Sequence, residues 1–89
     1  MVKVKKLMKI PAKDLTYYLS LPYSILLTPL SEEDGGGWFV EIPELPGCMS
    51  DGESQQEALE NIEDAKKLWL ESSLVHGDPI PEPQPQPIP

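Results

Sequence analysis

The sequence is poor in the residues that most often carry chemistry: it has one cysteine, Cys48, one histidine, His76, and no arginine. A lone cysteine excludes a disulfide within the chain, and no Cys or His spacing suits a zinc site. No apolar run approaches the roughly 18 residues that a membrane span needs, and VKVKKLMKI at the N-terminus lacks the apolar core of a signal peptide. We therefore expect a cytoplasmic protein with no metal, no cofactor and no membrane segment.

Basic residues are also scarce outside one segment. Residues 1–13 hold five of the seven lysines and no acid, whereas residues 14–89 hold two lysines and fifteen acids, a formal charge of −13 within a total of −8. So acidic a body repels nucleic acid and attracts basic partners, although acidity for solubility alone would look the same. The lysine arm has no arginine and no interleaved aromatics, so it is a weak indication of DNA binding. We do not expect this chain alone to bind DNA.

The length of 89 residues allows one domain. Six of the eleven prolines lie between Pro79 and Pro89. We predict a basic N-terminal arm over 1–13, a folded domain over 14–78 and a proline-rich extended tail over 79–89. A core of that size contributes only about 3–5 kcal/mol of net stability, which favours a homodimer or a higher homo-oligomer.

Short elements precede one long one along the chain. The pattern predicts a short helix within 12–23, a strand over 23–30, a glycine-rich hairpin loop over 31–37, an alternating strand over 38–42 and a short third strand over 48–50. The fold class is therefore α/β in the α+β sense: a small antiparallel sheet of about three strands, covered by one long amphipathic helix.

That helix has clear boundaries. Ser54 begins a Ser-x-x-Glu capping box in which Glu57 is expected to reach back to the backbone of Ser54, and Gly77 ends the helix. One face carries Ala58, Ile62, Ala65 and Trp69, widened by Leu59, Leu68 and Leu70. On the polar side we expect Glu63 and Lys67 to attract each other as an i,i+4 pair. The sheet should meet the apolar face through Trp38, Val40 and Ile42.

Between the second and third strands lies the sequence PELPG. Pro43 and Pro46 fix φ and remove two backbone donors, and Gly47 permits a sharp reversal. We assign these three residues, with Trp38 and Trp69, to the fold, and expect Gly47→Val to unfold or aggregate the protein.

Two catalytic readings are weak. Cys48 and His76 would make a nucleophile and base only if they met, and the acidic surroundings oppose a reactive thiolate. Carboxylates such as Glu41, Asp51, Glu53 and Asp64 could bind Mg²⁺ for nuclease chemistry, but no spacing among them defines a site. We expect no enzymatic activity.

The segment GGGWFVEIPELPGCMSDGESQQEALENIEDAKKLWLE resembles the HicB-like antitoxin family. The resemblance covers about residues 14–83 and includes the corner over 43–48, Gly52, and the helix that opens with SQQEA. It implies a partial RNase H-like fold without nuclease function, in a protein that binds and occludes HicA, a small basic toxin that cleaves mRNA. This chain resembles a short form, without the C-terminal DNA-binding domain that many members carry.

Candidate contact residues follow from these expectations. We predict that acids on the exposed helix face bind the toxin: Glu60, Glu63, Asp64 and Glu71. We predict self-association through an apolar cluster on the short helix: Tyr17, Tyr18 and Leu19. Three alternatives stay open, namely a stand-alone oligomeric protein-binding module with no toxin partner, a residual metal-dependent nuclease, and DNA binding through the lysine arm.

Overall fold

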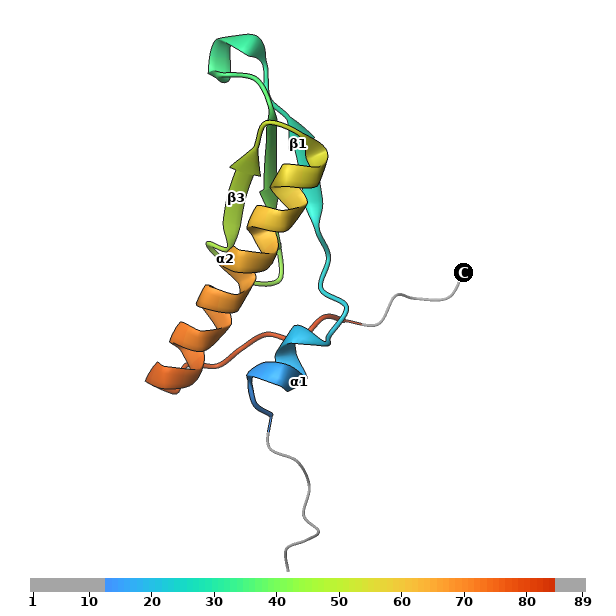
Figure 1. Ribbon diagram of the computed structural model, residues 1–89. Coiled ribbons are helices and arrows are strands. Elements are labelled where there is room, and N and C mark those ends of the chain that lie inside the picture. Colours follow the sequence, from blue (N-terminus) through green and yellow to red (C-terminus); the bar gives the residue numbers. More distant parts are fainter. Residues whose placement is uncertain (1–12, 85–89) are drawn as a thin grey trace, which may run out of the picture.

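The computed structural model describes residues 13–84, and Figure 1 shows their arrangement. A three-stranded sheet with one long helix across it forms the upper part of the view, and a short helix lies below the sheet. The predicted basic arm lies outside the described residues except for Lys13, as does the end of the predicted tail, residues 85–89. The elements in chain order are α1 Leu15–Leu19, β1 Leu26–Pro29, a 3₁₀ turn Glu32–Asp34 (η1), β2 Trp38–Glu41, β3 Met49–Gly52 and α2 Gln55–His76.

The sheet has the order β1-β2-β3, and both neighbouring pairs are antiparallel. This confirms the predicted hairpin and the predicted α+β class. The strands are shorter than 23–30 and 38–42 suggested, and the third strand begins one residue later than predicted and runs two residues further. The RNase H-like relationship stays a prediction.

The long helix begins and ends where the sequence predicts. The Ser54 hydroxyl oxygen accepts a hydrogen bond from the backbone N–H of Glu57 at 3.0 Å, and Gly77 ends α2 with φ +71°. The expected return contact is different: the carboxylate of Glu57 accepts from the N–H of Glu53, at 2.6 Å, and not from Ser54. The Glu57 side chain thus gives a hydrogen-bond partner to the backbone N–H of the residue before the N-cap, and it links the end of β3 to the helix.

The core lies between one face of the sheet and α2. Val40, Ile42, Ala58, Ile62 and Leu70 are at most 1% exposed, which confirms that the predicted faces of sheet and helix meet. Ala65 and Trp69, predicted at the centre of the stripe, are only partly buried.

Three expectations about the helix surface were wrong. Leu68 is 67% exposed and Leu59 is 38% exposed, so neither widens the buried stripe. Lys66 is instead buried, and it forms the ion pair with Glu63 at 3.1 Å that the sequence suggested for Lys67. The buried residues Ala58, Ile62, Lys66 and Leu70 recur every fourth position, so the stripe is narrow and turns slowly around α2.

The PELPG corner consists of two successive turns. The N–H of Leu45 donates to the carbonyl of Ile42, and the N–H of Cys48 donates to the carbonyl of Leu45. Each turn has a proline at its second position, and Gly47, at the third position of the second turn, has φ +84°. Leu45 is fully buried between the two turns, so the corner contributes a core side chain as well as a reversal.

The corner is also attached to its surroundings. The indole N–H of Trp69 donates to the carbonyl oxygen of Pro46 at 2.8 Å, and the carboxylate of Glu44 accepts from both the N–H and the hydroxyl of Ser24. These contacts join the corner to α2 and to the segment that leads into β1.

Residues 79–84 carry no helix or strand, yet they contact α1 and the segment after it. The Tyr23 hydroxyl donates to the carbonyl oxygen of Pro81 at 2.6 Å, and the Tyr17 hydroxyl donates to the carboxylate of Glu82 at 3.0 Å. Lys13 forms an ion pair with the same carboxylate at 3.0 Å. The first part of the proline-rich segment is therefore held against the body of the protein.

This attachment should weaken in acid. The hydrogen bond from Lys13 lowers the pKa of Glu82 below its usual value of 4.5. A carboxylate with a lowered folded-state pKa stabilises the attached state above its ordinary pKa, and the contribution is lost as pH falls through the lowered value. We expect the ring-proton NMR shifts of Tyr17 and Tyr23 to change together below pH 4.5. Glu82→Gln should abolish that transition, and an unchanged transition in this variant would show that another group causes it.

Candidate functional site

An acidic cavity lies at the end of the sheet where the β1–β2 hairpin loop faces the start of α2. It has a volume of about 340 Å³. Because β1 ends, β2 begins and β3 ends at this edge, the antiparallel order brings the loop and the β3–α2 junction together. The residues that line the cavity are Leu30, Asp34, Gly35, Gly36, Asp51, Gly52, Glu53, Glu57 and Asn61.

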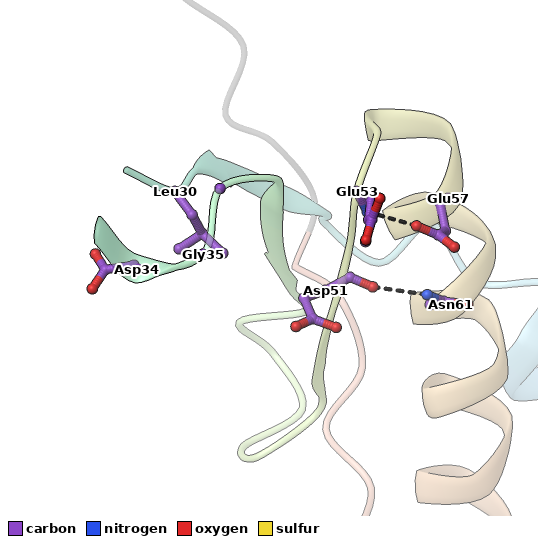
Figure 2. Close-up of a pocket in the computed structure, with 9 residues that line it drawn as sticks. Leu30, Asp34, Gly35, Asp51, Glu53, Glu57 and Asn61 are labelled. Atoms are coloured by element: carbon purple, nitrogen blue, oxygen red, sulfur yellow. Dashed lines mark hydrogen bonds between the residues drawn. The ribbon is translucent and has the colours of Figure 1, made fainter. Parts of the chain in front are cut away.

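Figure 2 shows how these side chains are placed. Asp34 and Gly35 belong to the loop. Across from them lie Glu53, just before α2, and Glu57 and Asn61 in its first two turns, with Asp51 between the two groups. The amide of Asn61 donates to the backbone carbonyl of Asp51 at 2.8 Å and so fixes the helix against β3.

Glycines form parts of two walls of the cavity, the hairpin loop and the end of β3. The loop ends in Gly35, Gly36 and Gly37, whose φ values of +99°, +70° and +82° are all left-handed. Gly52 has an ordinary φ, but a Cβ there would lie 2.8 Å from the Cα of Ala58. Glycine at position 52 thus allows β3 to touch the first turn of α2 directly.

The cavity gathers four carboxylates: Asp34, Asp51, Glu53 and Glu57. Two of them are used locally, since Asp34 accepts from the Ser31 hydroxyl at 3.0 Å and Glu57 accepts from the backbone of Glu53. Within residues 13–84, no group of three or more His, Cys, Asp and Glu side chains is arranged to hold a metal ion. With four carboxylates, the cavity concentrates negative charge, which favours contact with a positively charged group.

The nuclease candidates are not brought together. Val40 faces α2 and is fully buried, so its neighbour Glu41 points to the opposite side of the sheet. Asp64 is exposed on α2, and the sheet separates it from Glu41. Asp51 and Glu53 do share the cavity, but without the other two.

Cys48 and His76 are in different environments. The Cys48 thiol is buried, and burial raises its pKa, which opposes thiolate formation. Nδ1 of His76 lies 2.7 Å from the carbonyl oxygen of Ser72, one turn earlier at the exposed end of α2. The Cys–His pair considered from sequence is absent among these contacts.

The predicted toxin-contact acids lie along α2. Glu60 and Asp64 are exposed, Glu63 pairs with Lys66, and Glu71 is half-buried. None of the four lines the acidic cavity. The cavity acids could have been found from the hairpin topology, which places residues 30–37 and 52–57 at one end of the sheet.

The predicted self-association residues make contacts within the chain. Tyr18 is 9% exposed and belongs to the core, and its ring meets that of Tyr17 edge to face at 5.0 Å. Tyr17 and Leu19 are partly buried against the core.

Comparison with known proteins identifies the family. Residues 23–88 match the family model described as HicB-like antitoxin of bacterial toxin-antitoxin system. This protein belongs to the HicB-like antitoxin family. The match confirms the family resemblance seen in the PELPG corner and the SQQEA helix start. It does not test the RNase H-like relationship.

Individual relatives of this HicB-like chain come from bacteria and archaea. A UPF0150 protein of Synechocystis is 41% identical over 59 residues, which cover 66% of this chain and 77% of the relative. A UPF0150 protein of Thermoplasma acidophilum is 34% identical over 61 residues, covering 68% and 84%. Antitoxin HicB 1 of Photorhabdus laumondii is 33% identical over 66 residues, covering 74% of this chain but 41% of the antitoxin. None of the helices that the structure describes is long and apolar enough to cross a bilayer.

Proposed function

We propose that this protein is a non-enzymatic antitoxin that binds a small basic mRNA-cleaving toxin of the HicA type and occludes its catalytic surface. The match to the HicB-like antitoxin family over residues 23–88 carries the proposal. The relative named Antitoxin HicB 1 supports it. Because the target of such a toxin is mRNA, the proposal places the protein in the cytoplasm.

The charge distribution supports binding by occlusion. Residues 14–89 carry a formal charge of −13, and the acidic cavity concentrates four carboxylates in one place. A toxin that binds RNA has to present positive charge toward phosphates, and an acidic surface competes for that same charge. Association should therefore be fast at low salt and slower as salt screens the attraction.

The first experiment is co-expression of this chain with the small basic protein encoded beside it, followed by co-purification and an RNA-cleavage assay. We expect a complex that withstands gel filtration, and cleavage that stops when this chain is added at equimolar amounts. Cleavage that continues in the presence of a stable complex would contradict occlusion. Cleavage by this chain alone with Mg²⁺ would contradict a non-enzymatic role.

A second candidate function is a stand-alone oligomeric protein-binding module. Exposed apolar side chains on α2 favour it, because Leu68 is 67% and Val75 is 81% exposed, and both could be covered by another copy. Tyr17 and Leu19 would extend such a contact, whereas Tyr18 is already buried in its own chain. A molar mass from light scattering that matches a dimer, with no basic neighbour bound, would favour this function.

A further inference from the structure

Among residues 13–84, no helix lies over one side of the sheet. α2 crosses the side on which Val40 lies, and α1 lies beyond the lower end of the strands (Figure 1). By alternation along each strand, six side chains point to the other side. We call this surface the open face, and it consists of Leu26, Thr28, Phe39, Glu41, Met49 and Asp51.

The open face mixes apolar groups with carboxylates in two cross-strand rows. Glu41 lies between Leu26 and Met49, and Phe39 lies between Thr28 and Asp51. Leu26 is 50% and Met49 is 49% exposed. Single exposed apolar residues are ordinary, but here two of them flank Glu41 and the half-buried Phe39 lies beside them, so the face is both apolar and acidic.

The carboxylates of the open face have no cation within the described chain. The two salt bridges among residues 13–84 join Lys13 to Glu82 and Lys66 to Glu63, away from the strands. Within residues 13–84, Glu41 and Asp51 are therefore available to a positively charged partner.

A second copy is a poor occupant. Three strands of four residues form a surface of about 13 by 14 Å, on the order of 200 Å², whereas a stable interface needs about 800 Å² from each partner. Two open faces in contact would also bring Glu41 and Asp51 against like charges.

A basic partner avoids the like-charge contact, and the adjoining cavity adds to the small area of the open face. Asp51 belongs to the open face and also lines the acidic cavity, so the two surfaces are continuous around β3. We infer that the open face and the adjoining cavity form the surface on which the basic partner docks, with Phe39, Leu26 and Met49 as its apolar centre. This inference rests on the proposed function and replaces the acids of α2 as the main contact.

The test compares charge-matched variants of the full chain. Met49→Lys and Glu41→Lys change the open face, while Leu68→Lys and Glu60→Lys change the outer side of α2 by the same net charge. Binding is measured with the co-purified basic toxin by titration calorimetry, after thermal unfolding by circular dichroism has shown that each variant is folded. We expect the open-face variants to raise Kd at least about tenfold more than their α2 counterparts.

Oxidation of Met49 in the unsubstituted protein gives a readout that needs no folded variant. Its rate with hydrogen peroxide should fall several-fold when the toxin is bound. An unchanged oxidation rate, or equal losses of affinity in the open-face and α2 variants, would overturn the inference while leaving toxin binding itself established. If the unsubstituted chain binds no toxin, the proposed function fails together with it.

Discussion

Gly52→Ala is expected to remove most of the stability of this protein. The added methyl would lie 2.8 Å from the Cα of Ala58 and from the carbonyl carbon of Glu57, and nearer still to the backbone nitrogen of Ala58. These are backbone atoms of the first turn of α2, so no side-chain rotation can relieve the overlap. The helix would have to move away from β3.

The expected cost is large relative to what the domain has available. Overpacking a tight contact costs about 1–3 kcal/mol and sometimes more. A single core of this size has only about 3–5 kcal/mol to lose. Urea unfolding followed by far-ultraviolet circular dichroism should show a much lower midpoint, or no folded baseline.

Gly47→Ala is the matched control. Gly47 has φ +84° but no atom within 4 Å of a Cβ, so the change strains the backbone without a clash. The expected loss is about 1–2 kcal/mol, smaller than that of Gly52→Ala. Gly47→Val has the same left-handed φ to overcome, so backbone strain acts in that variant as well. A larger loss in Gly47→Ala than in Gly52→Ala would show that turn geometry, rather than the close contact of β3 with α2, limits stability.

The elements of the fold were predictable because their determinants are local. The cap at Ser54 and the stop at Gly77 bound α2 correctly, and the three glycines of the loop together with the alternation after them defined the hairpin. Strand ends were less accurate, because pairing with a neighbour decides where a strand stops. The prolines of the corner predicted a turn, but not that Leu45 would be a core residue.

The site was harder to predict because it depends on contacts between distant segments. Nothing in the local pattern says that Asp34 and Glu57 share a cavity, although the hairpin order places their segments at one end of the sheet. The open face was implicit in the alternation of β2, where Phe39 and Glu41 were assigned to the side away from the helix. What the sequence pattern did not show is that no element within the described part of the chain covers that side.

Lys66 was not predicted as a buried residue, because helix patterns treat lysine as a surface residue. Its side chain is 8% exposed, and its position follows Ile62 and precedes Leu70 by four residues each. The regular spacing of Ala58, Ile62 and Leu70 is the indication that position 66 faces the sheet. Lysine is tolerated there because its long apolar stem packs while the ammonium reaches Glu63.

Lys66→Glu should prevent folding. The change places a carboxylate in a buried position beside Glu63, whose side chain is 53% exposed, in a chain that already carries −8. Leaving a buried charge without an opposite partner costs about 3–5 kcal/mol, the whole expected stability of the domain. Thermal unfolding by circular dichroism would then show no cooperative transition at neutral pH.

Lys66→Met separates the role of charge from that of packing. Methionine retains a long apolar stem and needs no counter-ion, and replacing a buried ion pair with an apolar side chain is often neutral or stabilising by about 1–4 kcal/mol. We expect a melting temperature equal to or above that of the unsubstituted protein. Equal stability of the Met and Glu variants would mean that water reaches position 66. Methionine keeps the packed apolar stem but lacks the ammonium group. A strong loss of stability in Lys66→Met would therefore show that the ion pair with Glu63 holds α2 in register on the sheet.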